Sequence, residues 1–373
     1  MARRITSTPE PEDLPEADRL EGFPHPRETV KVFGHEAEEK MLAETFSTGR
    51  MHHGWLLAGR EGIGKATLAY RFARYVLADD ADREPFGVSL DVPPESTAAR
   101  QVRALSHPGL LVLRRPYNFK DKRFAASIPV DEMRRLRAFL GLSAGGQGYR
   151  VVIVDTAEDL NASSANAILK SLEEPPPQTY FLIVASEPGR VLPTIRSRVR
   201  TLDLKPLEPQ AMRAAVVQAT AAAGAEIPMG KAWEQLLKLA NGSVRRLLSL
   251  SATGGLGVHE KVQRIVEGLP RMDWHGAHAL SDELAGLAAE QKLELFFELL
   301  LDAIARLVRC EATGIPEDDR ALAHRVIGPA RLATFAELWE TVAREKSQAL
   351  ALNLDRKTLV LSTLARLEAA AAP

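Results

Sequence analysis

Short apolar runs alternate with helix-spaced apolar positions between about residue 30 and residue 207. The runs predict buried strands at 55–58, 110–113, 149–155 and 180–185, and the half-polar stretch 201–204 is a candidate for a last short strand. Apolar residues three or four positions apart predict helices between them, near residues 37, 65, 130 and 165. Continuous apolar runs suit strands that are covered on both faces, as in a parallel sheet. The pattern therefore predicts an α/β domain with a parallel sheet.

The two ends of the chain carry different patterns. Residues 1–28 are rich in Pro, Glu and Asp, and such a composition buries too little apolar surface to offset the entropy of ordering. After residue 207 the strand-like runs stop, and amphipathic helices fill the remainder. We therefore predict a disordered tail at 1–28, the α/β domain at 29–207, a small helical domain at 208–256 and a C-terminal all-helical domain at 257–373.

Composition excludes several classes of protein. Lys and Arg total 48 against 49 Asp and Glu, so the overall charge does not favour nucleic acid, and any such site must be a local patch. The single cysteine, Cys310, excludes an internal disulfide and suits a reducing cytoplasm. No apolar region follows Arg3 and Arg4, which argues against a secretory signal. The most apolar helical pattern, at 293–308, is interrupted by charged residues, so we expect no membrane span.

A glycine-rich stretch between the first strand and the next helix is a candidate phosphate site. Its glycines would let backbone N–H groups turn toward an anion at the helix N-terminus, and its lysine would reach the β- and γ-phosphates. This is the nucleotide-binding P-loop pattern, formed by Gly59, Gly62, Gly64 and Lys65. The next residue should be Ser or Thr, whose hydroxyl holds Mg²⁺, but it is Ala66. The hydroxyl of Thr67 comes one residue late, about 100° further around the helix.

A second feature of nucleotide sites is also incomplete. Asp155 ends the strongest strand, where a carboxylate normally coordinates Mg²⁺. In an active ATPase the next residue would be a glutamate that polarises water, but here it is Thr156, which cannot act as a general base near neutral pH. Glu158 is a weaker substitute, because its backbone position directs it elsewhere. The pocket can therefore hold ATP or ADP but is poorly equipped for Mg²⁺, and we predict weak or absent hydrolysis.

Several further motifs carry a resemblance to a known family. Residues 166–176 and 194–198, together with Asp155, Ser186 and 242–245, resemble the AAA+ clamp loaders, and within them the delta-prime subunits of bacterial DNA polymerase III. The resemblance covers about residues 32–253 with clear motifs. It implies a P-loop AAA+ domain with a parallel sheet, followed by a helical lid domain and a C-terminal helical collar domain that mediates oligomerisation.

The resemblance also implies roles for single residues. In clamp loaders a Ser-Arg-Cys motif supplies an arginine finger to ATP held by the neighbouring subunit, and this chain has Ser197-Arg198-Val199. Without that context, Arg198 would be interpreted as an ordinary solvated or locally paired arginine. Ser186 takes the sensor-1 position and Arg245 the sensor-2 position. Delta-prime proteins often carry a four-cysteine zinc module in the region of 79–106, but no cysteine occurs there, so we expect no zinc.

The family implies a set of partners and leaves three hypotheses. The partners are ATPase subunits and a clamp-opening subunit in a hetero-oligomeric ring of the DNA polymerase III holoenzyme, primer–template DNA through the assembled complex, and the sliding clamp indirectly. The leading hypothesis is a stator with a degenerate ATP site that donates Arg198 in trans during DNA replication. One alternative is an active ATPase motor subunit that uses Thr67 and a water molecule. The other is an interaction protein for which neither nucleotide nor Arg198 matters.

One basic segment with interleaved aromatic residues, at 114–124, has two interpretations. It could bind single-stranded nucleic acid by stacking and charge. A plain basic surface hairpin is the commoner explanation of such a pattern.

Overall fold

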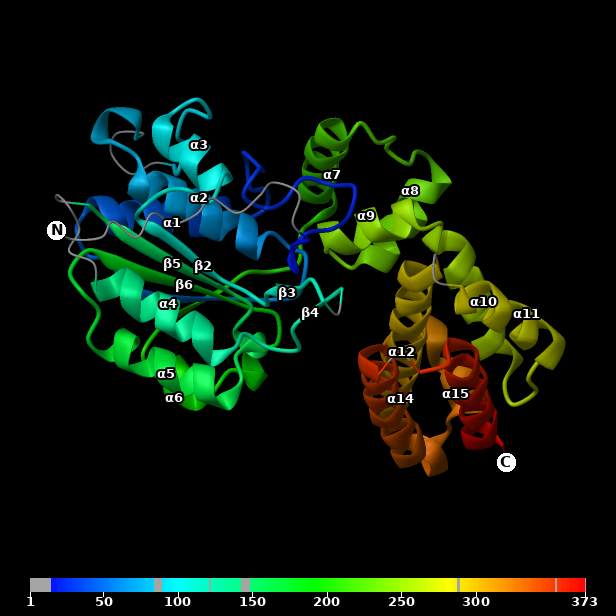
Figure 1. Cartoon of the computed structure of the whole chain (residues 1–373). Helices are drawn as coiled ribbons and strands as arrows, with labels where there is room; N and C mark the ends of the chain where they lie inside the picture. Colours follow the sequence, from blue (N-terminus) through cyan, green and yellow to red (C-terminus); the bar gives the residue numbers. More distant parts are fainter. Residues whose placement is uncertain are drawn as a thin grey trace. The chain divides into compact units, whose positions relative to one another are not determined.

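The computed structural model describes residues 15–83, 89–120, 122–141, 148–286, 289–352 and 354–372. The chain forms two compact units, Met1–Leu248 and Ser249–Pro373 (Figure 1). The first contains the sheet and the helices up to the start of α9 (Val244–Ala252), and the second contains helices alone.

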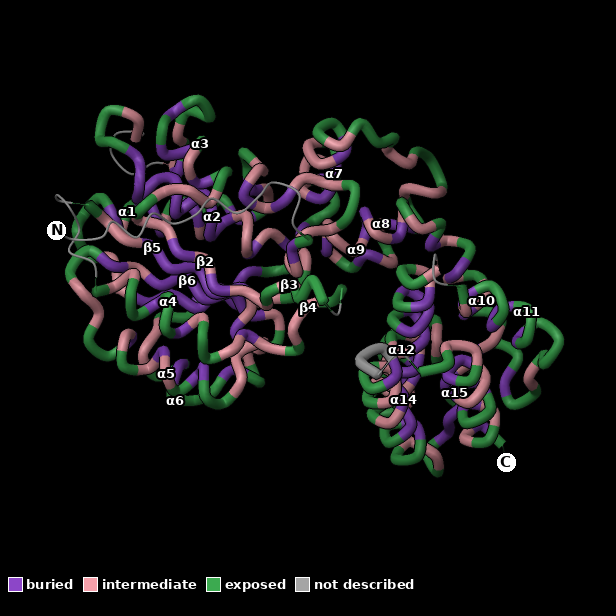
Figure 2. The backbone as a smooth tube through the Cα atoms, in the orientation of Figure 1, coloured by how far each residue is buried: buried purple, intermediate pink, exposed green. Residues whose placement is uncertain are grey.

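A five-stranded parallel sheet forms the centre of the first unit. Its strand order is β2-β5-β6-β1-β7, and every neighbouring pair is parallel. The strands are β1 (Gly54–Ala58), β2 (Leu110–Leu113), β5 (Arg150–Asp155), β6 (Thr179–Ala185) and β7 (Arg200–Asp203). All of β1 and nearly all of β5 and β6 are buried (Figure 2). The predicted α/β class with a parallel sheet is therefore confirmed.

Helices cover both faces of this sheet. Side chains of α4 (Val130–Gly141), α5 (Ala162–Glu173) and α6 (Pro193–Arg196) pack with strand residues such as Leu56, Val152 and Phe181 in one apolar cluster. The opposite face carries α1 (Glu36–Ser47), α2 (Lys65–Leu77) and α3 (Thr97–Arg103) (Figure 1). The lid region adds α7 (Pro209–Ala223) and α8 (Lys231–Ala240) before α9.

Two stretches between these elements refine the sequence predictions. Composition rich in Asp, Pro and Ser predicts a loop at 79–100, but the region contains the start of α3. The Ser96 hydroxyl accepts a hydrogen bond from the Ala99 N–H at 3.2 Å and caps that helix. Segment 114–124 forms the predicted hairpin from β3 (Tyr117–Asn118) and β4 (Arg123–Phe124). Phe119 at its tip is 62% exposed. Nucleic-acid contact by this hairpin stays a prediction.

The second unit is built from helices of its own. They are α10 (Gly255–Gly268), α11 (Trp274–Ala285), α12 (Glu290–Thr313), α13 (Arg320–Val326), α14 (Leu332–Leu352) and α15 (Arg356–Ala371). Their buried side chains include Phe296, Phe297 and Leu300 of α12, Phe335 of α14 and Val360 of α15. Among the described residues, no helix has the length and apolar character needed to cross a membrane. The boundaries at 207/208 and 256/257 stay predictions.

Short 3₁₀ turns link several of these elements. They lie at Asp80–Asp82, Ala157–Asp159, Pro188–Arg190, Glu317–Asp319 and Pro329–Arg331.

The N-terminal residues differ from the prediction. Residues 1–14 lie outside the described residues, but residues 15–28, here called the N-terminal segment, pack against the first unit with Glu16, His25 and Arg27 buried. Glu16 forms ion pairs with Arg27 and with Arg114, the latter at 2.8 Å. The predicted mobile tail is therefore wrong for residues 15–28. The composition of residues 15–28 shows their acidic charges, but it does not show that Arg114, distant in sequence, neutralises Glu16 and Asp18.

Candidate functional site

Three glycines shape the loop between β1 and α2. Gly59, Gly62 and Gly64 have φ values of 144°, 75° and 106°, a region that side chains rarely adopt. A Cβ atom on Gly59 would lie 2.4 Å from the Leu204 carbonyl oxygen, and one on Gly62 would lie 2.4 Å from Cβ of Arg245. Glycine therefore lets the chain after β7 and the start of α9 approach the loop closely.

Lys65 is bound by the loop that it follows. Its Nζ donates hydrogen bonds to the carbonyl oxygens of Gly59, at 2.7 Å, and Arg60, and to Oγ of Ser186 at 3.1 Å. The residue is 4% exposed. Burial lowers the pKa of Lys65 to about 8, although nearby carboxylates favour its charged form. The structure thus brings Ser186 beside Lys65, and a sensing role for Ser186 stays a prediction.

Asp155 lies at the same edge of the sheet, at the end of β5. No described residue donates a hydrogen bond to its Oδ2 atom, which is buried. Burial raises the pKa of Asp155 to about 7, the charge of Asp18 raises it further, and Lys65 opposes the change. Thr156 follows directly, so the strand end offers one carboxylate and no second one beside it.

The loop fits a phosphate group better than it fits a metal ion. The cradle is followed by the 13-residue helix α2, whose N-terminal N–H groups favour an anion, and Lys65 adds a cation. Ala66 has no oxygen to offer Mg²⁺, and Glu158 accepts a hydrogen bond from the Glu187 N–H instead. Within the described ranges, no group of three or more His, Cys, Asp or Glu residues is placed to hold a metal ion.

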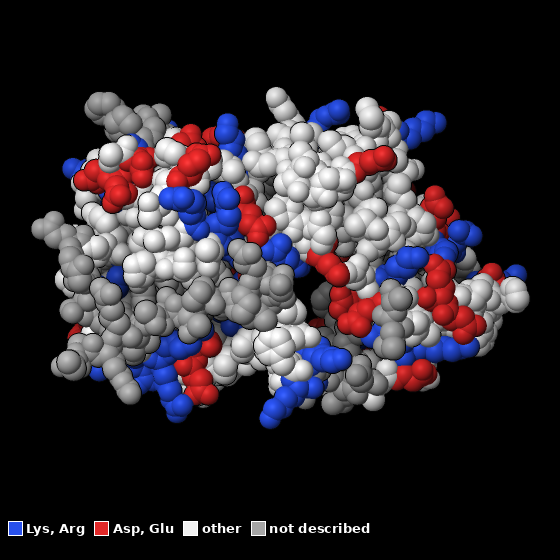
Figure 3. Space-filling view, turned by 45° about the horizontal axis from the view of Figure 1, so that its top comes forward, with Lys and Arg blue, Asp and Glu red and all other residues white. Residues whose placement is uncertain are grey.

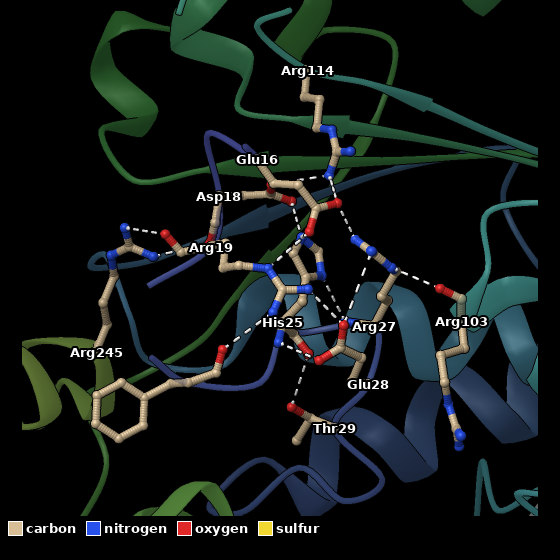
Figure 4. A network of polar contacts seen from close by, with 11 residues as sticks. Glu16, Asp18, Arg19, His25, Arg27, Glu28, Thr29, Arg103, Arg114 and Arg245 are labelled. Atoms are coloured by element: carbon tan, nitrogen blue, oxygen red, sulfur yellow. Dashed lines mark hydrogen bonds and ion pairs between the residues drawn. The ribbon is translucent and has the colours of Figure 1, made fainter. Parts of the chain in front are cut away.

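Arg245 lies over the glycine loop but is engaged by protein groups. The N–H groups of Val244 and Arg245 donate to the Gly62 carbonyl at 2.9 and 3.3 Å, which docks the start of α9 on the loop. The Arg245 guanidinium lies 3.2 Å from the Glu61 carboxylate. It also donates to the carbonyl oxygens of Asp18, at 2.9 Å, and Arg19, at 3.4 Å (Figure 4). The predicted sensor-2 residue therefore contacts the N-terminal segment.

Arg198 follows α6 and is partly exposed. Its Nε donates to Oε1 of Glu173 at 2.8 Å, and its Nη1 donates to the Thr194 carbonyl at 2.9 Å. The side chain of Arg198 is 35% exposed and that of Glu173 is 47% exposed. An ion pair this exposed contributes at most about 1 kcal/mol, so Arg198 can leave Glu173 for another partner at little cost.

Strand register places Arg198 at the edge of the sheet opposite the glycine loop. Arg200 pairs with Trp55, and Asp203 pairs with Ala58, after which the loop begins. Parallel strands rise about 3.3 Å per residue, so the start and end of this pairing are about 10 Å apart. Arg198 lies two residues further from the loop. The arginine therefore lies at the edge of the sheet away from the nucleotide site of its own chain.

Arg114 and Asp18 are site residues that the sequence reasoning missed. Arg114 follows β2 directly and lies 3.2 Å from the Asp18 carboxylate. Since Leu113 pairs with Val154, the residues after β2 and at the end of β5 share one edge, and correct strand pairing could have placed Arg114 near Asp155. No sequence signal identifies Asp18.

Comparisons with known proteins identify the family. A family model described as "DNA polymerase III, delta subunit" matches residues 34–208. DNA polymerase III subunit delta' of Pseudomonas aeruginosa is 34% identical over 220 residues, covering 59% of this chain and 61% of that protein. DNA polymerase III subunit delta' of Escherichia coli is 30% identical over 273 residues, covering 72% of this chain and 74% of that protein. The chain belongs to the delta-prime family of clamp-loader subunits.

Similarity within the delta-prime family extends along the chain. The delta' subunit of Yersinia pestis is 28% identical over 357 residues, covering 90% of this chain and 94% of that protein. The chain matches 61% of the length of the Pseudomonas relative, however. Activity and partners of this delta-prime family member are therefore proposals.

Proposed function

We propose that the chain is a stator subunit of a DNA polymerase III clamp loader, with a degenerate ATP site, that donates Arg198 to nucleotide held by a neighbouring subunit. A guanidinium supplied in trans stabilises the charge that develops on the γ-phosphate during transfer. Such a subunit contributes to ATP turnover during DNA replication without hydrolysing much ATP itself.

The position of Arg198 carries this proposal. It is partly exposed at the edge of the sheet that lies opposite its own glycine loop. An arginine there cannot serve the nucleotide site of its own chain. It can serve a site that a neighbouring chain brings to that edge.

The groups around Lys65 support weak or absent hydrolysis. Ala66 offers no hydroxyl for Mg²⁺, and Thr156 offers no carboxylate to activate water. Lys65 is held by its own loop and by Ser186, and Arg245 by the N-terminal segment. ATP or ADP can bind this cradle through its phosphates, with Mg²⁺ poorly supported.

The proposed partners are the ATPase subunits and the clamp-opening subunit of a hetero-oligomeric ring. Acidic and basic side chains are interspersed over the face in Figure 3, in line with the near-equal totals of 48 and 49. Interspersed charges of both signs create no field that attracts nucleic acid to this face, so we propose contact with primer–template DNA only through the assembled complex, and with the sliding clamp indirectly.

Arg198→Ala in a reconstituted loader tests the proposal. The P-loop lysines of the other ATPase subunits are replaced by Ala, so that only the subunit beside Arg198 hydrolyses ATP. We expect its turnover to fall about a thousandfold or more, since a trans arginine contributes that much. Arg198→Lys should restore little of the lost ATP turnover, because an ammonium group lacks the planar fork of the guanidinium. Arg196→Ala, at an exposed position of α6, is the matched control.

Two results would favour the alternatives. Unchanged turnover and clamp loading with Arg198→Ala would support a pure interaction protein. An active motor subunit would be supported if the isolated chain hydrolysed ATP at about 1 per second, a typical enzymatic rate, and Lys65→Ala abolished that activity.

A further inference from the structure

Arg114 holds the N-terminal segment at the carboxyl edge of the sheet. Arg114, directly after β2, lies 2.8 Å from Oε1 of Glu16 and 3.2 Å from Oδ1 of Asp18. His25 lies 2.8 Å from Oδ2 of Asp18 and is fully buried (Figure 4). The ion pairs of Arg114, which is distant in sequence, fix Glu16 and Asp18 beside the ends of β2 and β5, and the contact between Asp18 and His25 lies within the segment.

The far end of the segment is tied to two helices. Arg27 donates to the Arg103 carbonyl at the end of α3, at 2.7 Å. Arg74 of α2 donates to the carbonyl oxygens of Arg27, at 3.1 Å, and Thr29, at 2.7 Å. Both arginines are nearly buried, so the segment is part of the packed unit.

Between these anchors the segment reaches the nucleotide site. The carbonyl oxygens of Asp18 and Arg19 accept hydrogen bonds from the two Nη atoms of Arg245. The carboxylate of Glu61, in the glycine loop, forms an ion pair with Nε of Arg245. A phosphate in the cradle would need the same guanidinium. It would also meet the carboxylate of Asp18, which lies near enough to Asp155 to raise the pKa of that group.

We propose that the N-terminal segment is an intramolecular competitor of nucleotide, which occupies Arg245 and closes the lid on the glycine loop until it is displaced. The docked segment then supplies the link between α9 and the sheet that a nucleotide would otherwise supply through its phosphates. The subunit keeps its lid in place without a ligand. The proposal does not rest on Arg198 or on any partner subunit.

A docked segment lowers the apparent affinity for nucleotide in proportion to the fraction of chains in which the segment is undocked. If the segment is docked nine-tenths of the time, affinity falls about tenfold, because only the undocked fraction binds. Conversely, saturating nucleotide must release the segment. Competition is reciprocal: the docked segment lowers the affinity for nucleotide, and bound nucleotide lowers the docked fraction of the segment.

Hydrogen exchange on the unmodified full-length chain gives the first test. Amide exchange within residues 16–28 is measured without ligand, with ADP and with inorganic phosphate. We expect faster exchange with ADP, because the segment leaves Arg245. Unchanged or slower exchange at ADP concentrations that saturate the chain would overturn the proposal, since the segment and the nucleotide would then be bound together.

The second test weakens the segment while keeping its shape. The double variant Glu16→Gln with Asp18→Asn removes both carboxylates that face Arg114 and keeps the backbone carbonyls. Binding of a fluorescent methylanthraniloyl-ADP should become about tenfold tighter. Asp131→Asn, which removes an exposed carboxylate paired with Arg134 on α4, should match the unmodified chain.

Each other result of the second test contradicts competition. Equal affinity in all three chains, with exchange data showing a released segment, would mean that the segment does not exclude nucleotide. Weaker binding by the double variant would make the segment part of the nucleotide site. Absence of binding in every chain at millimolar probe would mean that something other than the segment excludes nucleotide. Should the double variant fail to fold, the exchange experiment decides alone.

Discussion

Burial shifts the pKa values of two charged side chains beside the cradle, Asp155 and Lys65. The pKa of Asp155 is raised to about 7 and that of Lys65 is lowered to about 8, in both cases chiefly because burial disfavours the charged form. Both groups therefore change charge close to neutral pH. The phosphate-binding charge of the loop should weaken as the pH rises through about 8.

Asp155→Asn should stabilise the first unit at pH 8 relative to pH 5. An acid whose folded pKa is raised from 3.8 to about 7 binds more protons when folded, so stability is full below 3.8 and is lost as the pH rises to 7. Between pH 5 and 8 the loss is about 3 kcal/mol, at about 1.4 kcal/mol per pH unit. Asparagine lacks this titration, and calorimetric unfolding of variant and unmodified chain at both pH values measures the difference.

The window from pH 5 to pH 8 isolates Asp155 from two other shifted groups. The lowered pKa of Lys65 acts between about 8 and 10.5. Although burial opposes the change, His25, Arg27 and Arg114 lower the pKa of Glu16 to about 2, so Glu16 acts between 4.5 and about 2. Asp203→Asn, at the exposed end of β7, is the control. Parallel pH profiles for Asp155→Asn and the unmodified chain would contradict the assignment.

Among the elements, α9 depends on the glycine loop for its position. Its first two N–H groups donate to the Gly62 carbonyl, and Gly62 leaves no space for a Cβ atom beneath Arg245 and Ser243. The loop is therefore a packing surface for the lid as well as an anion cradle. Any change in its backbone must move α9.

Gly62→Ala should destabilise the first unit more than Gly224→Ala does. Both glycines have positive φ, 75° and 64°, so both variants carry a similar backbone cost. The new Cβ at 62 would also lie 2.4 Å from Ser243 Oγ and Arg245 Cβ, whereas nothing lies within 4 Å of one at 224. Overpacking adds about 1–3 kcal/mol, which thermal unfolding detects. Equal destabilisation by Gly62→Ala and Gly224→Ala would mean that α9 can shift away from the new Cβ atom without a cost in stability.

The elements of the sheet could be predicted from sequence, but several contacts at the site could not. All residues of β5 between Arg150 and Asp155 are apolar because both faces of the strand are covered, so the sequence pattern indicates a buried strand. The contact between Asp18 and Arg114 joins residues 96 positions apart, and neither residue type indicates its partner. For the same reason, the composition of residues 15–28 suggested disorder although their charges are neutralised in the folded unit.

On the scale of the whole molecule, the second unit has a core of its own. The residues that α12 buries recur at helical spacing. Helix α12 packs with α14, and α14 packs with α15; Phe335 and Val342 of α14 and Leu364 of α15 are buried. A cluster of this kind supplies stability that does not depend on the sheet.

A fragment of residues 249–373 should therefore fold alone. We expect a helical circular dichroism spectrum and a cooperative thermal transition, because its apolar side chains are buried among its own helices. Leu300→Asp, at a fully buried position, should abolish the transition, and Leu354→Asp, at a position that is 53% exposed, should preserve it. A fragment without a cooperative transition would mean that the unit needs the rest of the chain.

Because its strands are parallel, the sheet gives the subunit a front and a back. Subunits that associate head to tail use two different surfaces, and each contact joins the back of one to the front of the next. Here the back offers the complete guanidinium of Arg198, while the front offers a cradle that lacks the hydroxyl at 66 and the carboxylate at 156. In a proposed ring of this kind, the chain completes the active site of one neighbour and needs no finger from the other. In that proposed ring, the junction at the front of this chain would contain no site equipped for rapid ATP hydrolysis.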